Sequence, residues 1–308
     1  MSSRRLIPSS GPAIVYESDT YRIRSRCVGA DFEIRVARPM PAFMGAPAGQ
    51  YDVLYLLDGD LFFGLATDTT RLMHQLFGEL SPTLVVAVGY GTGDGRIVGE
   101  TRNRDFTPTA DAGFAALGPP PGAGPEPLLP EGKRYGGAAP FLDFLLDEVQ
   151  PLIAEAYPLT TGRSTLVGSS MGGLFASYVL LERPEAFTQY IIASPALWWN
   201  DHLLVRTADE RPLLRGREPA RVFLAVGALE ERAEIPLLAT FKLVSNVSEF
   251  ARLLQARPAP GLDVWLHVFE SETHASVVPV ALTRGLRTLQ GVSGPPSLPE
   301  RERHEGHA

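Results

Sequence analysis

The amino-acid sequence predicts an α/β fold in which a mostly parallel eight-stranded sheet is flanked by helices. Two observations carry this prediction. Eight short apolar runs have the length and composition of strands. The first two runs are close enough to form a hairpin, whereas segments with helical spacing of apolar residues separate the later ones. Alternation of strand, helix and strand is typical of a parallel sheet.

Each predicted strand is a continuous or alternating apolar run, and each predicted helix carries apolar residues at helical spacing. The strands are predicted at 21–28, 32–37, 53–57, 84–90, 165–168, 190–194, 222–226 and 264–269. The helices are predicted at 62–80, 138–157, 172–182, 237–256 and 277–289. We therefore expect a single domain over residues 1–293, followed by a polar, flexible tail at 294–308.

One segment, residues 91–137, interrupts the alternation of strands and helices. It is rich in glycine and proline, includes the run Pro119-Pro120-Pro121, and cannot be a helix or strand throughout. The segment leaves the sheet at the carboxyl end of a predicted strand, where α/β proteins bind their ligands. We therefore interpret it as a lid, with a disordered surface insertion as the alternative for residues 113–132.

Composition and charge narrow the class of protein. With 308 residues and 44% hydrophobic content, the chain can bury a large core. The formal net charge of −7 argues against a nucleic-acid partner, because phosphates would be repelled. Cys27 is the only cysteine, which excludes an internal disulfide and a cysteine-based metal cluster. With no apolar signal segment and no run near ~18 apolar residues, we expect a cytoplasmic protein with no membrane partner.

One motif predicts a reactive serine. The stretch Gly168-Ser169-Ser170-Met171-Gly172 follows the apolar run Thr165-Leu166-Val167 and opens a predicted helix. A G-x-S-x-G motif between a strand and a helix is typical of a nucleophile elbow, a strained turn that exposes the serine hydroxyl at the N-terminus of the helix. We therefore predict that Ser170 is a catalytic nucleophile, with an ordinary Ser/Gly turn as the alternative.

A serine hydroxyl needs a general base and a carboxylate that orients the base. His274 is the predicted base, since it follows the last predicted strand in a short polar loop and completes the chain order serine, acid, histidine. A solvent-exposed loop histidine is the alternative. The other histidines lie in the tail, in a helix, after a tryptophan pair or in a strand: His304, His307, His74, His202 and His267.

The acid is expected in the loop after the predicted strand 222–226, at the same edge of the sheet as Ser170. Glu230 is the predicted acid, because the turn after the strand would point it toward that edge. Glu231 is a close rival and Asp201 a distant one. The alternative for either glutamate is an ordinary carboxylate at a helix N-terminus.

Acyl transfer also needs two amide donors for the developing oxyanion. The Met171 amide is the first, since it follows the nucleophile at the start of a predicted helix. The Asp60 amide is the second, because it lies in the loop after the predicted strand 53–57. An ordinary turn at Asp58-Gly59 is the alternative for this loop.

Four motifs follow one another along the chain. They are Tyr55-Leu56-Leu57-Asp58-Gly59-Asp60, Gly168-Ser169-Ser170-Met171-Gly172-Gly173, Ser194-Pro195-Ala196-Leu197-Trp198-Trp199 and Glu272-Thr273-His274-Ala275-Ser276. Together they resemble the putative esterase branch of the α/β-hydrolases, which is similar to enterobactin, salmochelin and bacillibactin esterases, the esterase D group, feruloyl esterases and mycolyltransferases. The resemblance covers residues 21–289 and implies an α/β-hydrolase fold and a serine esterase that needs no metal or organic cofactor.

A fifth motif implies a class of substrate. Arg102-Asn103-Arg104-Asp105-Phe106-Thr107-Pro108 is similar to the R-x-x-D-[YF]-T-P element of the cytoplasmic siderophore esterases. The resemblance implies a small-molecule ester, with a catecholate siderophore lactone as the leading candidate. Arg102 and Arg104 would then pair with an anionic ligand, and Trp198 and Trp199 would flank its aromatic rings.

These substrate contacts have internal alternatives. Arg102 or Arg104 could pair with Asp105 and anchor the loop, and the two tryptophans could pack in the core beneath the lid. The whole protein also has two alternative functions, an acyltransferase of the mycolyltransferase type and a non-catalytic scaffold that binds a ligand. Both keep the same fold, so activity is what separates them.

Overall fold

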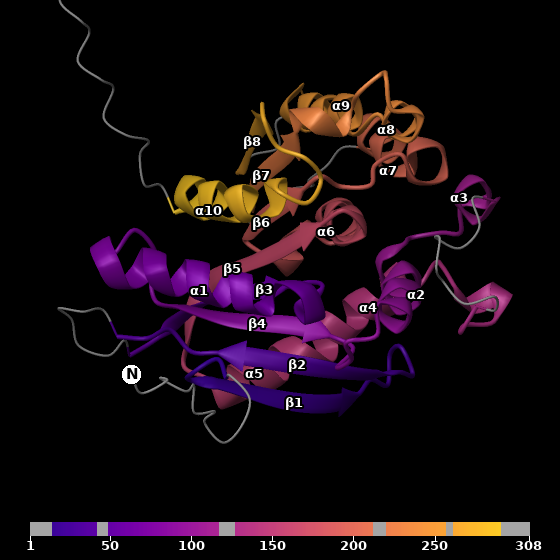
Figure 1. Cartoon of the computed structure of the whole chain (residues 1–308). Coiled ribbons are helices and arrows are strands. Elements are labelled where there is room, and N and C mark those ends of the chain that lie inside the picture. Colours follow the sequence, from indigo (N-terminus) through magenta and orange to yellow (C-terminus); the bar gives the residue numbers. More distant parts are fainter. Residues whose placement is uncertain (1–13, 42–48, 117–126, 212–219, 257–260, 291–308) are drawn as a thin grey trace, which may run out of the picture.

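One twisted sheet runs through the described part of the chain (Figure 1). The computed structural model describes residues 14–41, 49–116, 127–211, 220–256 and 261–290. The predicted tail at 294–308 and the run Pro119-Pro120-Pro121 lie outside the described residues. All eight predicted strands are present, and they pair in the order β1-β2-β4-β3-β5-β6-β7-β8.

The observed strands overlap the predicted ranges, but one begins six residues earlier than predicted, at Leu159, and another ends four residues earlier, at Arg24. They are β1 (Ser18–Arg24), β2 (Asp31–Ala37), β3 (Tyr51–Leu56), β4 (Thr83–Gly89), β5 (Leu159–Ser169), β6 (Gln189–Ala193), β7 (Ala220–Gly227) and β8 (Leu262–Phe269). β1 and β2 pair antiparallel, β2 pairs antiparallel with β4, and the remaining pairs are parallel. The prediction of a mostly parallel eight-stranded α/β sheet is therefore confirmed.

Burial on both faces explains the composition of the central strands. Every residue of β4 and of β6 is buried, and strands covered on both faces are near-continuous apolar runs. The edge strand β1 is partly or fully exposed along its whole length, and most of its residues are polar. Because the central strands are parallel, the carboxyl ends of β5, β6 and β7 meet at one edge of the sheet.

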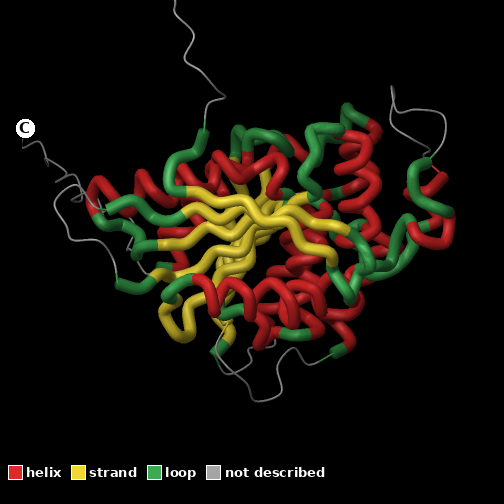
Figure 2. Tube along the Cα trace, turned by 90° about the horizontal axis from the view of Figure 1, so that it is seen from below, coloured by secondary structure: helices red, strands yellow, loops and turns green. Residues whose placement is uncertain are grey.

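Helices cover both faces of the sheet (Figures 1 and 2). They are α1 (Gly59–Phe77), α2 (Gly95–Phe106), α3 (Ala112–Ala116), α4 (Ala138–Phe144), α5 (Gln150–Ala156), α6 (Met171–Glu182), α7 (Trp199–Glu210), α8 (Pro236–Phe241), α9 (Leu243–Ala256) and α10 (Val277–Leu289). α1 and α10 pack on one face, and α4, α6 and α9 cover the other. Among the described helices, none is both long and apolar enough to cross a membrane.

Two predicted helices are interrupted, and three others were not predicted. The predicted helix 138–157 divides into α4, a π-helical turn (Leu145–Val149) and α5. The predicted helix 237–256 divides into α8 and α9 at Lys242, whose φ of 46° is left-handed. α2, α3 and α7 were missed. The first turn of α7 includes left-handed backbone angles at residues 200–202, so its apolar residues do not follow one helical repeat.

The segment 91–137, predicted as a lid, contains more regular structure than the sequence indicated. α2 begins after Asp94, whose carboxylate accepts hydrogen bonds from the Arg96 and Ile97 amides. At the other end of α2, Phe106 is buried and its ring centroid lies 5.5 Å from that of Phe141. The first part of the segment therefore packs against the helices on the sheet, and a covering role stays a prediction for the residues after α2.

Candidate active site

β5 ends in a sharp turn at Ser170, and α6 begins at the next residue. Ser170 has φ 58° and ψ −118°, a conformation that costs a non-glycine residue about 1–3 kcal/mol. Gly168 permits the turn, because a Cβ atom there would lie 2.2 Å from the Gly172 carbonyl oxygen. The strand, strained turn and helix expected of the G-x-S-x-G motif are therefore present in the backbone.

His274 and Glu230 come together beyond the ends of the neighbouring parallel strands β7 and β8. Glu230 lies in a short 3-10 helix (Ala228–Glu230) after β7, and His274 follows β8. The imidazole Nδ1 atom lies 2.5 Å from the Glu230 Oε2 atom. When a neutral imidazole donates from Nδ1 to a carboxylate, its Nε2 atom keeps a lone pair. This is the arrangement of an oriented general base.

Burial distinguishes the two members of this pair. The Glu230 side chain is 0% exposed, whereas the His274 side chain is 45% exposed. The rival acids have other partners: Glu231 accepts hydrogen bonds from the Ser245 amide and hydroxyl, and Asp201 is exposed and pairs with Arg206. Of the three carboxylates considered from the sequence, Glu230 is the one that contacts His274.

The remaining histidines have different surroundings. His267 lies in β8 with its ring centroid 4.2 Å from that of Phe269, and burial together with the nearby Arg284 charge lowers its pKa. The His74 ring in α1 makes a 2.9 Å hydrogen bond to the Leu80 carbonyl. His304 and His307 lie outside the described residues. Neither His267 nor His74 is therefore placed to serve Ser170.

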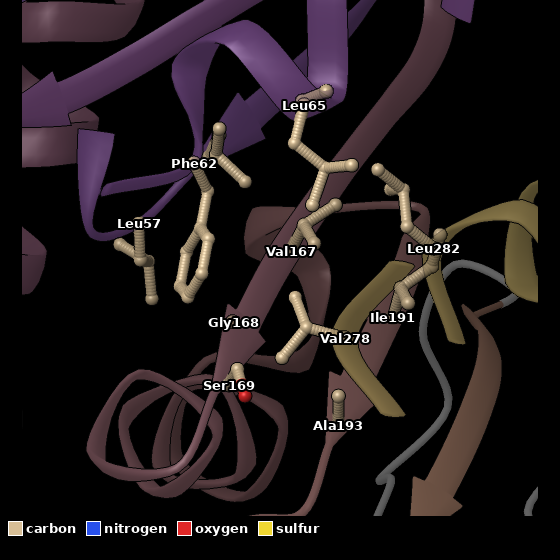
Figure 3. Close-up of a pocket in the computed structure, with 12 residues that line it drawn as sticks. Leu57, Phe62, Leu65, Val167, Gly168, Ser169, Ile191, Ala193, Val278 and Leu282 are labelled. Atoms are coloured by element: carbon tan, nitrogen blue, oxygen red, sulfur yellow. The ribbon is translucent and has the colours of Figure 1, made fainter. Parts of the chain in front are cut away.

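The N-terminal turn of α10 lies beside the serine turn. Ser169 and Val278 line the same small cavity of about 20 Å³, between β5, β6, α1 and α10. Figure 3 shows that Ser169 supplies the one polar side chain of this lining. His274 lies in the loop that leads from β8 into α10, three residues before the helix begins. In the described part of the chain, His274 bonds to Glu230 rather than to Ser170, and catalytic hydrogen bonds often tighten only when substrate binds.

The two amides predicted for the oxyanion hole both lie in the first turn of a helix. Met171 is the first residue of α6, and Asp60 is the second residue of α1. Amides in a first helical turn have no partner within the helix and attract negative charge. A Cβ atom at Gly172 would lie 3.1 Å from the Asp58 carboxylate, so the turn before α1 lies against the turn at Ser170.

Polar contacts on both sides hold the turn of Asp58 and Asp60. The Asp60 carboxylate accepts hydrogen bonds from the Tyr90 and Gly91 amides at 2.5 and 3.2 Å. Asp58, whose φ of 55° is left-handed, accepts two hydrogen bonds from Arg102 at 2.7 and 2.8 Å. Burial lowers the pKa of Arg102, but the Asp58 charge outweighs it and the net pKa is raised. This ion pair therefore stabilises a strained turn at the edge of the site.

Both arginines predicted to bind substrate have carboxylate partners inside the protein. The Arg102 side chain is 18% exposed, and the Arg104 side chain is 17% exposed. Arg104 makes two hydrogen bonds to Asp105, the internal pair considered from the sequence. Arg102 instead pairs with Asp58, which lies 44 positions away and was not considered. An anionic ligand would therefore compete with a carboxylate already in place.

The two tryptophans lie in different environments. Trp199 is fully buried, and its Nε1 atom donates a 3.0 Å hydrogen bond to the Thr109 carbonyl. Its ring packs in the core, the alternative considered from the sequence, and a contact between Trp199 and a substrate stays a prediction. Trp198 is half-buried and stacks on Phe241, with ring centroids 4.4 Å apart. The Trp198 ring is the one that a ligand could reach.

Ser194 is a polar residue of the site that the sequence did not reveal. Its hydroxyl donates a 2.6 Å hydrogen bond to the Glu230 Oε1 atom. Its position in the motif Ser194-Pro195-Ala196 was visible in the sequence. The two residues are 36 positions apart, and only the alignment of β6 with β7 brings them together.

Known proteins resemble this chain over most of its length. The model of the family described as Putative esterase matches residues 123–282. Ferri-bacillibactin esterase BesA of Bacillus subtilis is 31% identical over 263 residues, which cover 83% of this chain and 84% of that protein. Siderophore enterobactin esterase of Emericella nidulans is 30% identical over 260 residues, covering 79% and 83%. The solved structure of siderophore hydrolase EstA from Aspergillus nidulans has a TM-score of 0.76 at 26% identity, covering 95% of this chain and 100% of that one.

Proposed function

Because the chain belongs to the Putative esterase family and is a carboxylic-ester hydrolase with the α/β-hydrolase fold, we propose that it hydrolyses the ester bonds of a siderophore with Ser170 as nucleophile. The observation that carries the mechanism is the 2.5 Å contact between His274 and Glu230 beside the strained turn at Ser170. Two relatives are named as siderophore esterases, and this supports a siderophore as the class of substrate.

The proposed reaction proceeds through an acyl-enzyme. The Ser170 hydroxyl attacks the ester carbonyl while His274 Nε2 takes its proton, and Glu230 stabilises the resulting imidazolium. The Met171 and Asp60 amides hold the oxyanion of the tetrahedral intermediate. His274 then gives the proton to the departing alcohol, and a water molecule, deprotonated by His274, releases the acid and restores Ser170. The reaction needs no metal or organic cofactor.

The proposed substrate is a catecholate siderophore lactone. The half-buried face of Trp198 would stack on an aromatic ring, and Arg102, at the edge of the site, would attract an anionic one. Arg104 is held in the same way by Asp105, so either guanidinium group would meet an anion beside a carboxylate that it already binds. We also propose that the enzyme works in the cytoplasm on a small molecule, which fits its single cysteine and net negative charge.

The test compares wild type with Ser170→Ala and His274→Ala on p-nitrophenyl acetate and on a catecholate trilactone. Each substitution should lower kcat/KM by at least about 10³-fold, because the nucleophile and its base act as a unit. Ser177→Ala is the matched control, since its buried hydroxyl bonds only within α6, to the Gly173 carbonyl at 2.9 Å. It should retain activity. Folding is checked for each variant by circular dichroism.

Two further readouts separate the alternatives. A fluorophosphonate should label wild type and not Ser170→Ala; folded wild type that stays unlabelled would point to a ligand-binding scaffold. Product analysis with and without an added alcohol separates hydrolysis from acyl transfer, since a transferase would form a new ester instead of the free acid. Activity on p-nitrophenyl esters without turnover of the trilactone would reject the proposed siderophore substrate and leave the esterase assignment in place.

A further inference from the structure

The turn between β6 and α7 touches both the nucleophile and the acid. At one end, the Ser170 amide donates to the Ala193 carbonyl and the Ala196 amide donates to the Ser170 carbonyl, at 3.0 and 3.1 Å. Between these two residues, the Ser194 hydroxyl donates to Glu230 at 2.6 Å. This one turn therefore links the backbone of the nucleophile to the side chain of the acid.

Ser194 has the features of a residue held in place by its surroundings. It is 0% exposed, so its hydroxyl cannot exchange its partner for bulk water. Its φ of 43° is left-handed, which is unfavourable for a residue with a side chain. Such strain persists where neighbouring contacts fix the backbone, and it clusters at functional sites. The contact that this conformation makes is the hydrogen bond to Glu230.

The two carboxylate oxygens of Glu230 have different hydrogen-bond partners. Oε1 accepts hydrogen bonds from the Ser194 hydroxyl and from the Gly227 amide at 2.7 Å. Oε2 is left for His274. Carboxylate torsions are broad, so without these donors the group would turn freely about its last bond. Two donors on one oxygen therefore determine the direction in which the other oxygen meets the imidazole.

The loops that carry the acid and the base are also joined through their backbones. The Leu229 amide donates a 3.1 Å hydrogen bond to the Glu272 carbonyl. A Cβ atom at Gly227 would lie 2.2 Å from the same carbonyl oxygen, so the two loops approach as closely as a glycine allows. This contact sets the distance between Glu230 and His274, while the donors on Oε1 set the orientation of the carboxylate.

We propose that Ser194 is a positioning residue of the esterase: its hydroxyl fixes the Glu230 carboxylate, and through it the orientation of His274 toward Ser170. This inference rests on the proposed function. Ser194 does not touch the substrate, because it is fully buried. Its loss should therefore lower kcat and leave KM for a small neutral ester unchanged.

The test uses Ser194→Ala and Ser194→Gly, with Ser25→Ala as the matched control. Ser25 is also a buried serine whose hydroxyl donates to a buried glutamate, Glu148, but it lies in the turn between β1 and β2, at the opposite end of the strand order from β7 and β8. Both Ser194 variants should lower kcat for p-nitrophenyl acetate on the order of 10-fold, part of the 10²–10⁴ that general acid–base catalysis supplies. Ser194→Gly accepts the left-handed backbone without strain, so it keeps the fold if Ser194→Ala does not.

A double-mutant cycle with Glu230→Gln separates positioning from structural support. If Ser194 acts through Glu230, Ser194→Gly should change kcat less than about twofold in the Glu230→Gln background, after subtraction of the Ser170→Ala rate. An equal loss in both backgrounds, or Ser194→Gly with wild-type kcat, would overturn the inference while the esterase assignment stands. Inactive wild type, or active Ser170→Ala, would instead overturn the proposed function.

Discussion

Glu230 and Glu148 are two buried glutamates with similar partners and different surroundings. Each accepts a hydrogen bond from a serine hydroxyl and from at least one backbone amide. For Glu230 these are Ser194 at 2.6 Å and the Gly227 amide at 2.7 Å; for Glu148 they are Ser25 at 3.1 Å and the Arg26 and Cys27 amides at 3.0 Å. Glu148 lies in the π-helical turn between α4 and α5 and holds the turn between β1 and β2.

The difference lies in the remaining acceptor site. The second oxygen of Glu230 meets the half-exposed imidazole of His274, a group that can take up and release a proton. Glu148 has fixed donors instead. Burial raises its pKa, but the hydrogen bonds from Cys27, Ser25 and the Arg26 amide outweigh burial, so its pKa lies below the usual value. The same buried carboxylate thus anchors a turn in one place and orients a base in the other.

The largest expected difference is in catalysis. Glu230→Gln should lower kcat/KM for p-nitrophenyl acetate on the order of 10³-fold, because the amide would donate to Nδ1 and favour the wrong tautomer of His274. Glu148→Gln should stay within about twofold of wild type at a temperature where it is folded. Steady-state kinetics on both variants measure the contrast. Equal activities would show that the two carboxylates do not differ in function.

The glycines beside the two glutamates offer the next contrast. Gly227→Ala should lower kcat on the order of 10²-fold, because its Cβ atom would push the Glu272 carbonyl, 2.2 Å away, and move the loop of His274. Gly29→Ala meets no atom within 4 Å, but its φ of 72° is left-handed. It should cost about 1 kcal/mol of stability and no activity. Kinetics and urea unfolding distinguish the two effects, and a reversed pattern would contradict this account.

Glu148 should matter mainly for stability. Glu148→Gln should lower the free energy of unfolding by about 2 kcal/mol at pH 7, since its amide group cannot accept from all the buried donors. The folded-state pKa of Glu148 is lowered, so its contribution is complete above the unfolded-state pKa near ~4.3 and is lost as the pH falls through the folded value. Urea unfolding from pH 3 to 7 should show the two proteins converging in acid. A constant difference would exclude this linkage.

The smallest effect concerns the thiol of Cys27. Its hydrogen bond to Glu148, with burial and the Glu148 charge, raises its pKa to about 11. At pH 8 the thiol should therefore react slowly with iodoacetamide, and Glu148→Gln should accelerate the reaction by about 10-fold, because a neutral partner no longer disfavours the thiolate. Glu230→Gln is the control and should leave the rate unchanged. The same slow rate in Glu148→Gln would show that the carboxylate does not control the thiol.

Local patterns in the chain predicted most of the fold and the centre of the site. Runs of neighbouring residues predicted the eight strands, the turn at Ser170 and the position of His274 after the last strand. Apolar spacing and turn residues act over a few positions, so they can be recognised without knowing the packing. The π-helical turn and the whole of α7 were missed, because both depart from the regular helical spacing.

Packing between distant segments decided the rest. Arg102 pairs with Asp58, and His274 pairs with Glu230, across 44 positions of the chain in each case. Glu230 was the acid chosen from the sequence, but only the folded loops show that it contacts His274 while Glu231 binds Ser245. Trp199 is buried and Trp198 is partly exposed. This difference depends on how the two neighbouring tryptophans pack, and the sequence alone does not show it. Composition and spacing reveal which groups a chain carries, while hydrogen bonds and burial depend on distances that exist only after the sheet has formed.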